Sequence, residues 1–397
     1  MKFVPFCWRL SAPKDFSPSL GLTKPPPSIG VAFFVTYNSE LFKHGFSRLI
    51  LSVNICTILV VEQALVPHLS VLYGLMAVSL APMKKSRILT LLDYLFVLRP
   101  TLFFPIWTIA LVGAYAAKRY SESWEPLGFW YGFIVFTLYT LTIGAVYLIN
   151  NIIDRRNDAA NNKVFLIADE FIPPHRALVY LSLLLIVITA LSIMVSIKLF
   201  WWFAAMFLIL GVAYSVPPFS LKDRPVGGLL TNVVSGFGLF GFGWYLYAPI
   251  DGISVWWHSL PYVIAWVSIS MLTTIPDSYG DALDQKETVA VAIGHSKTQD
   301  YAFLLLGAAL LFSFLTWDWV IGVTGLMALP FYTNMWRKRS VQSTLMAIRW
   351  GISFLSFSMF FAFPPYFIAC FILFFLARWY YRGRFNIDYP TWKTNSE

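Results

Sequence analysis

Long apolar runs separated by short polar segments occupy most of the chain from residue 102 onward. A helix needs about 20 mainly apolar residues to cross the hydrocarbon core of a bilayer, and nine runs approach or exceed that length. The runs are continuous rather than alternating, which favours helices over half-buried strands. The predicted spans are 102–117, 127–149, 178–197, 199–213, 226–247, 256–276, 301–317, 319–336 and 350–376.

The composition agrees with a chain that lies in lipid. Hydrophobic residues make up 58% of the sequence and charged residues only 12%, whereas a soluble domain carries about 25% charged residues. The sequence therefore predicts an all-α polytopic membrane protein with the lipid bilayer as a partner. The net charge of +9 lies mainly in short loops, where membrane topology accounts for it, so no nucleic-acid partner is expected. The sequence points to no protein partner.

The chain divides into three predicted parts. Residues 1–82 form an N-terminal extension that we expect to be poorly ordered, because its start is rich in proline and lacks the pattern of a signal peptide. Residues 83–384 form the membrane domain, and residues 385–397 form a C-terminal tail. Polar stretches close the second and sixth helices, which indicates two four-helix modules plus a ninth helix around a central cavity.

The first polar stretch follows the apolar run 127–149. Asn150, Asp154 and Asp158 are spaced four residues apart, so on a helix they share one face. A carboxylate near membrane depth costs about 2.5–3.5 kcal/mol even on a mild scale, and it usually has a partner or a function. Two carboxylates on one face repel each other unless a cation lies between them. Hard oxygen ligands of this kind suit Mg2+.

A second acidic stretch follows the apolar run 256–276. Asp277, Asp281 and Asp284 again share one helical face, although Pro276 and Gly280 weaken the helix there. One such cluster could be a solvated helix end. Two clusters that each close a membrane-length helix favour a functional site, and both are predicted to face one water-accessible cavity.

A basic loop lies between the fourth and fifth predicted helices, in the segment from Tyr214 to Arg224. Its paired prolines stop the preceding helix, after which Lys222 and Arg224 project on the same side as the acidic stretches. Their charges can set topology, or they can bind phosphate beside the carboxylates. Lys163 belongs to the same argument. Aromatic residues on the helices, among them Trp130 and Trp266, could line an apolar tunnel.

At these residues the chain resembles the UbiA superfamily of intramembrane prenyltransferases. The first family motif, Asn-Asp-x-x-Asp-x-x-x-Asp, corresponds to the segment from Asn150 to Asp158, with Asn151 where aspartate is usual. The second motif, Asp-x-x-x-Asp, corresponds to Asp277 and Asp281. The loop from Tyr214 to Lys222 is similar to a Tyr-Ser-x-Pro-Pro-x-x-Leu-Lys loop in some branches of the family. The resemblance covers about residues 88–380.

The resemblance implies Mg2+-dependent transfer of an isoprenoid group from a prenyl diphosphate to a lipophilic acceptor, with release of diphosphate. The implied catalytic residues are Asp154, Asp158, Asp277 and Asp281, which with Asn150 would hold the metal. The residues implied in diphosphate binding are Asn150, Asn151, Lys163, Tyr214, Lys222, Arg224 and Asp284.

The basic residues predict the orientation. Most lysines and arginines between helices fall on the side of the acidic stretches, including Lys222, Lys286 and Arg337. The positive-inside rule then predicts a multi-pass protein of the cell inner or plasma membrane, with its active site facing the cytoplasm. A transporter that couples ion movement to intramembrane carboxylates is the alternative function. The acceptor, which could be a quinone precursor, a chlorophyllide or another lipid, and the prenyl length stay open.

Overall fold

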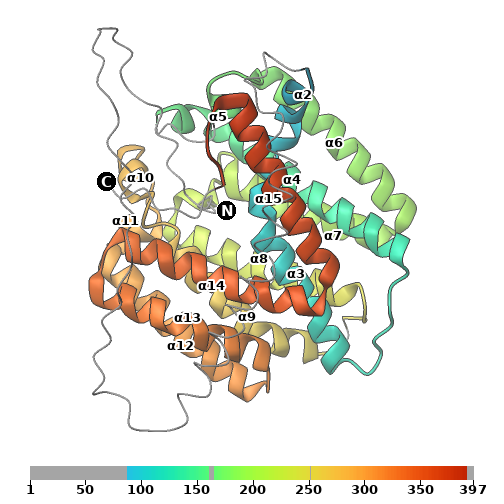
Figure 1. Ribbon diagram of the computed structural model, residues 1–397, viewed down its shortest axis with the longest axis vertical. Helices are drawn as coiled ribbons and strands as arrows, with labels where there is room; N and C mark the ends of the chain where they lie inside the picture. The colour runs from blue at the N-terminus through green and yellow to red at the C-terminus, as the bar shows by residue number, and fades with distance from the viewer. Residues whose placement is uncertain (1–86, 161–164, 251, 391–397) are drawn as a thin grey trace, which may run out of the picture. The chain divides into compact units, whose positions relative to one another are not determined.

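The computed structural model describes residues 87–160, 165–250 and 252–390. The predicted extension 1–82, most of the predicted tail and Lys163 lie outside these residues. Within the described ranges every regular element is a helix and none is a strand, which confirms the predicted all-α class (Figure 1).

The helices follow one another with short connections. The longer ones are α2 (Arg87–Phe96), α3 (Phe103–Tyr120), α4 (Phe129–Ala160), α6 (Pro174–Val195), α7 (Ile197–Met206), α8 (Pro225–Tyr245), α9 (Ser254–Leu272), α12 (His295–Leu315), α13 (Trp319–Lys338), α14 (Val341–Ala362) and α15 (Pro364–Phe385). The shorter ones are η1 (Pro100–Leu102), α5 (Phe165–Ala168), the π-helix η2 (Phe207–Ala213), η3 (Leu221–Asp223), α10 (Ser278–Leu283) and α11 (Val289–Ile293).

Seven helices in the described ranges are long and apolar enough to cross a membrane, by length and composition, and Ile197–Ala213 is a shorter apolar helix. This does not confirm a count of nine. Each of the first eight predicted spans coincides with one helical segment. The ninth, 350–376, is wrong as a single helix, because α14 ends at Ala362 and α15 begins at Pro364. The Pro364-Pro365 pair lacks the backbone N–H groups that would continue α14, and proline fits the first turn of a new helix.

The outer faces of these helices are apolar. On α6, Leu178, Leu183 and Ile186 are 51%, 57% and 64% exposed. A soluble protein rarely exposes apolar side chains in contiguous stretches, whereas lipid tails solvate them. The exposed apolar faces and the length of the helices agree with an integral membrane protein.

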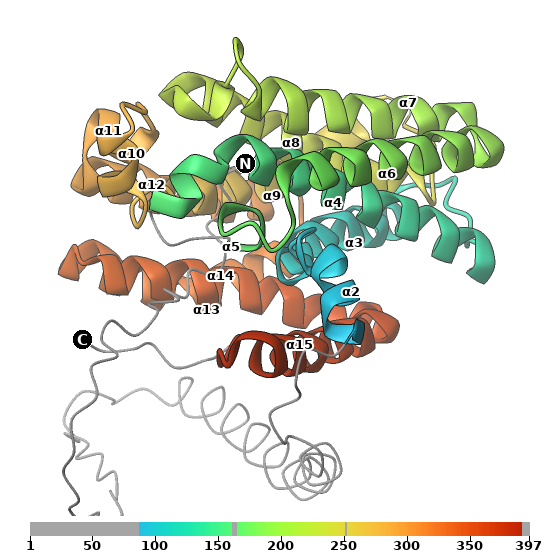
Figure 2. The same ribbon diagram turned by 90° about the horizontal axis from the view of Figure 1, so that it is seen from above.

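Two groups of helices flank a central pair. Helix α4 packs on α6 and η2, while α9, α12, α13 and α14 pack on one another. Helices α3 and α8 pack together between the two groups, as Figure 2 shows from above. The predicted relation of two four-helix modules by a pseudo-twofold stays a prediction.

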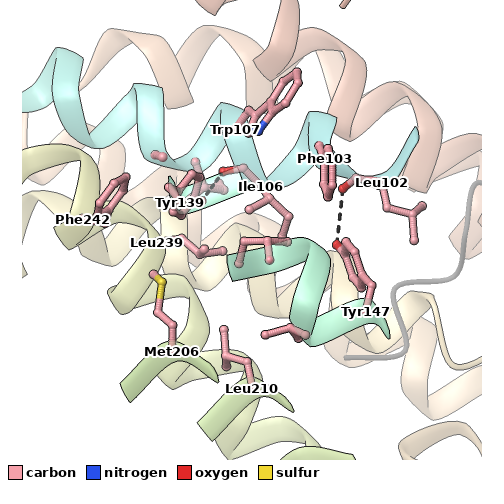
Figure 3. Close-up of a cluster of buried hydrophobic side chains, with 14 of the residues drawn as sticks. Leu102, Phe103, Ile106, Trp107, Tyr139, Tyr147, Met206, Leu210, Leu239 and Phe242 are labelled. Atoms are coloured by element: carbon pink, nitrogen blue, oxygen red, sulfur yellow. Dashed lines mark hydrogen bonds between the residues drawn. The ribbon is translucent and has the colours of Figure 1, made fainter. Parts of the chain in front are cut away.

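The interior around α3, α4 and α8 is aromatic and tightly packed (Figure 3). The Tyr139 hydroxyl of α4 donates to the Ile106 carbonyl of α3 at 3.0 Å, and its ring stacks on Phe242 of α8 with centroids 4.4 Å apart. One helical turn after Ile143, Tyr147 donates to the Leu102 carbonyl at 3.4 Å. These hydroxyls satisfy main-chain carbonyls near the start of α3, so the aromatic rings are buried without an unpaired polar group.

An apolar cavity of about 40 Å³ lies between α3, α9, α12, α13 and α14. Thr108, Trp266, Tyr332 and Ile352 are among its lining residues. Trp266 therefore lies where the sequence predicted an aromatic lining. Trp130 does not line this cavity, and its side chain is 73% exposed.

A buried ion pair joins the two ends of the described chain. Asp93 of α2 is 1% exposed and accepts hydrogen bonds from the Tyr380 hydroxyl at 2.7 Å and from Arg384 at 3.1 and 3.3 Å. Because removal of one partner leaves a buried charge, we expect Arg384→Met to destabilise the protein by about 3–5 kcal/mol. The exposed Arg382, two residues earlier on α15, is the matched control. Equal thermal midpoints for Arg384→Met and Arg382→Met in detergent would contradict a structural role of the pair.

Candidate active site

Helix α4 carries the first acidic stretch past the apolar part of the bundle. Its 32 residues correspond to about 48 Å at 1.5 Å per residue, whereas the hydrocarbon core is about 30 Å thick. By length and composition, the part of α4 that could cross a membrane includes Phe129–Arg155. Asp154 and Asp158 therefore lie near the C-terminal end of this helix.

Asn150 fixes the first carboxylate of this stretch. Its Nδ2 donates to Asp154 Oδ2 at 3.0 Å, one turn further on, and to Ser215 Oγ at 3.1 Å. Ser215 lies just after η2, and the approach of η2 to α4 depends on Gly211, where a Cβ would lie 3.2 Å from Ile149 Cγ2. The small residue thus lets the end of η2 come close enough for Ser215 to contact the motif.

Lys222 forms the second contact of Asp154. It lies in η3, after the Pro217-Pro218 break, and its ammonium pairs with Asp154 Oδ2. The Lys222 side chain is only 1% exposed. Burial lowers its pKa below the usual range, and the Asp154 carboxylate acts in the opposite direction. An ammonium this deeply buried needs an anionic partner at all times.

The second acidic stretch reaches the same carboxylate. Asp277 and Asp281, at the start and middle of the α10 segment, are 9% and 4% exposed. Lys286, which follows this stretch, places its Nζ 3.9 Å from Asp154 Oδ1 and 3.9 Å from Asp284 Oδ2. The next residue, Glu287, donates its backbone N–H to the Asp223 carbonyl at 3.0 Å. Segments from three parts of the chain thus converge beside Asp154.

Some of the predicted site residues are not among the residues that contact Asp154 in the interactions given above. Asn151 is one residue beyond Asn150 and so points about 100° away around the helix. Its Nδ2 donates to the Val97 carbonyl at 3.0 Å, and its Oδ1 accepts from Arg99 at 3.5 Å. Its position supports the turn before α3, and its predicted role in diphosphate binding stays a prediction. Arg224 is exposed, Asp158 is partly exposed one turn beyond Asp154, and Lys163 is not described.

The oxygen donors suit Mg2+ in chemistry. Asn150 and Asp154 of the first stretch carry hard oxygens, and so do Asp277 and Asp281 of the second, which are both buried. In the described part of the chain no three His, Cys, Asp or Glu side chains form a group that could hold a metal ion. Mg2+ does not require such a cage, because it usually takes one or two carboxylates together with water and phosphate oxygens. The residues therefore fit a metal bound jointly by protein and diphosphate.

A small pocket lies next to Lys222, between α8, α9 and α11. Its volume of about 20 Å³ is enough for one or two water-sized groups. Tyr214, Asn232 and Thr288 are among its lining residues, and the Thr288 hydroxyl has no hydrogen-bond partner within the described ranges. Sequence reasoning missed Ser215, Lys286 and Thr288 as site residues. Ser215 follows the predicted Tyr214 and Lys286 lies two residues after the predicted Asp284, and this proximity was the available signal.

The fold and the site define an integral membrane protein in which Lys286 forms ion pairs with carboxylates of both acidic stretches, Asp154 and Asp284. The chain belongs to the UbiA prenyltransferase family, whose model matches residues 106–357. The match covers more than half of the chain and confirms the resemblance inferred from the motifs.

One curated relative is a probable homogentisate phytyltransferase 2, chloroplastic, of Oryza sativa subsp. japonica, which is 31% identical over 212 residues. The alignment covers 50% of this chain and 53% of the relative, so the chain spans about half the length of that protein.

Solved structures support the same fold. A UbiA homologue from Archaeoglobus fulgidus, bound to DMAPP and Mg2+, matches with a TM-score of 0.53 and 16% identity, over 66% of this chain and 99% of that chain. An apo UbiA homologue from Aeropyrum pernix K1 matches with a TM-score of 0.52 and 13% identity, over 66% of this chain and 96% of that chain. At these identities the likeness is one of fold.

Proposed function

We propose that this protein transfers an isoprenoid group from a prenyl diphosphate to a lipophilic acceptor within the membrane, with Mg2+ as cofactor and diphosphate as the released product. The observation that carries the proposal is the convergence on Asp154 of Lys222 from the α8 side and Lys286 from the second acidic stretch. Acidic metal ligands and cations side by side are what a metal-bound diphosphate requires.

The relatives support this chemistry. The rice relative is named for phytyl transfer to homogentisate, and the Archaeoglobus homologue was solved with DMAPP and Mg2+. These names point to an isoprenoid donor and to an aromatic or lipid acceptor. The position of the carboxylates at helix ends, rather than at mid-membrane, favours an enzyme over an ion-coupled transporter.

The reaction breaks the allylic C–O bond of the donor, so negative charge grows on the departing diphosphate. Lys222 and Lys286 can stabilise that charge, and Arg224 lies on the same loop as Lys222. Mg2+, if bound here, would help to neutralise the same charge. Asn150, Asp154, Asp158, Asp277 and Asp281 are the residues proposed to hold it.

The apolar cavity supplies the second requirement of the reaction. An allylic cation reacts with water unless water is excluded, and this cavity lies within the bundle between α3, α9, α12, α13 and α14. Trp266 and Tyr332 present aromatic rings to it, and aromatic faces attract cations. A nucleophilic carbon or oxygen of the acceptor then forms the new bond. The excess of basic residues on the same side as the acidic stretches supports an active site that faces the cytoplasm.

Binding of a labelled prenyl diphosphate tests the proposal. Purified protein in detergent should bind labelled geranyl diphosphate in the presence of Mg2+, and EDTA should abolish the binding because no protein cation replaces the bridging metal. Excess Mg2+ added after EDTA is the control and should restore it. Binding that is the same with Mg2+ and with EDTA would refute a metal-dependent site, and the absence of binding under both conditions would refute the prenyl donor.

A further inference from the structure

We infer that Lys286 is a diphosphate-binding residue, and that it forms a two-lysine anion site with Lys222, which lies at the other carboxylate oxygen of Asp154. This inference rests on the proposed function and deepens it. The sequence had given Lys286 only a topological role.

The geometry places the two ammonium groups on different oxygens of one carboxylate. Lys222 pairs with Asp154 Oδ2, and Lys286 Nζ lies 3.9 Å from Asp154 Oδ1. A separation of 3.9 Å is an ion pair without a tight hydrogen bond. The Lys286 ammonium therefore keeps donors for a further oxygen ligand, since an ammonium has three N–H groups.

Both ammonium groups lie beside Asp154, one at each carboxylate oxygen. A second carboxylate, Asp284, lies 3.9 Å from Lys286, and its side chain is 26% exposed. The Lys286 side chain is only 11% exposed. A cation held in a partly buried position interacts more strongly with a ligand than one in bulk water. If Asp154 held a metal ion, both ammonium groups would be available to an anion bound beside it.

The backbone holds Lys286 at this position. Its own N–H donates to the Asp281 carbonyl at 2.8 Å, and the N–H of Glu287 donates to the Asp223 carbonyl, next to Lys222, at 3.0 Å. The segment that carries Lys286 is thereby joined to the second motif and to the Lys222 loop. A lysine that only sets topology needs neither contact, and Lys338 at the end of α13 is an exposed lysine of that ordinary kind.

Pyrophosphate affinity tests the inference without any acceptor or turnover. Titration calorimetry of the full-length protein in detergent, at fixed Mg2+, should show that Lys286→Met weakens inorganic pyrophosphate binding by about 10- to 100-fold, the usual effect of losing a hydrogen bond to a charged group. Lys286→Arg should restore most of the affinity, because it keeps the charge. Lys338→Met is the matched control and should bind like the wild type.

The outcomes separate this inference from the proposed function. If the wild-type protein does not bind pyrophosphate, the proposed function fails. If the wild-type protein binds it and Lys286→Met binds equally well, only the role of Lys286 fails. A loss of affinity that Lys286→Arg does not restore, together with a lower thermal midpoint, would show that Lys286 supports the fold and would overturn the inference. A loss with an unchanged midpoint and rescue by arginine would support it.

Discussion

Asp154→Asn is expected to reduce the rate of prenyl transfer by at least about 100- to 1,000-fold, the size of effect seen when one preorganised electrostatic group is removed from an active site. Asp154 is the residue on which the first motif, the Lys222 loop and the second acidic stretch converge. Its loss removes a proposed metal ligand and also the partner of two lysines. Turnover of labelled geranyl diphosphate by membranes that contain the variant is the measurement.

The test must distinguish a loss of stability in Asp154→Asn from a loss of catalysis. Asp154→Asn leaves Lys222 buried without its carboxylate, and an unpaired buried charge destabilises a protein by several kcal/mol. The double variant Asp154→Asn/Lys222→Met removes both members of the pair, so we expect its thermal midpoint to return towards that of the wild type. Its turnover should nevertheless stay lost, because the proposed metal ligand is still missing.

Two further variants complete the experiment. Asp277→Asn should lower turnover to a similar extent, because Asp277 is a proposed metal ligand from the second acidic stretch. Asp169→Asn, at an exposed position outside the site, is the control and should turn over like the wild type. Retained turnover in both Asp154→Asn and Asp277→Asn would defeat the assignment of these stretches to the chemistry.

Helix positions followed from the sequence because apolar runs and polar loops alternate so regularly. The prediction of one helix over 350–376 was wrong for a local reason. The hydropathy is continuous there, and only Pro364-Pro365 marks the break that separates α14 from α15. Helix α2 was not predicted as a separate element. Its residues precede the first predicted span, 102–117, and a short turn at Arg99 and Pro100 divides them from α3.

Part of the site could be predicted from the sequence. The spacing of Asn150 and Asp154 correctly predicted that they share a face, because that depends only on helix geometry. The contact of Asn151 with Val97 depends on how the turn after α2 approaches α4, which the sequence does not reveal. Lys286 was missed for a similar reason. Many loop lysines are interchangeable in sequence, and only the path of the chain between α10 and α11 brings this one to Asp154.

Close packing of α3 on α8 gives the second large expected effect. A Cβ added at Gly243 of α8 would lie 1.7 Å from the Ala110 carbonyl oxygen of α3, and a Cβ at Gly113 of α3 would lie 2.0 Å from the Phe240 carbonyl oxygen of α8. The two backbones are therefore in direct contact through glycines on both sides. Small residues allow such an approach between membrane helices, where packing rather than the hydrophobic effect drives association.

Gly243→Ala should accordingly force α3 and α8 apart by more than about 1 Å, because the obstacle is backbone and cannot rotate away. We expect a loss of stability of about 3 kcal/mol, the upper end of overpacking effects, measured as a lower thermal midpoint in detergent. Gly238→Ala is the matched control on the same helix, since a Cβ there would meet only the Met206 methyl group at 3.9 Å. The control should be neutral or slightly stabilising, because alanine is the better helix former.

Gly243→Ala should also affect prenyl transfer. Helix α3 contributes Pro105, Thr108 and Ile109 to the apolar cavity, so displacement of α3 alters the space in which the proposed carbocation must be kept from water. At a temperature where Gly243→Ala is still folded, pyrophosphate should bind as in the wild type, because the contacts around Asp154 come from α4, η3 and the α10–α11 segment. Turnover should fall, with more of the labelled donor hydrolysed to the free prenyl alcohol. A thermal midpoint for Gly243→Ala equal to that of Gly238→Ala would show that α3 and α8 do not pack in this way.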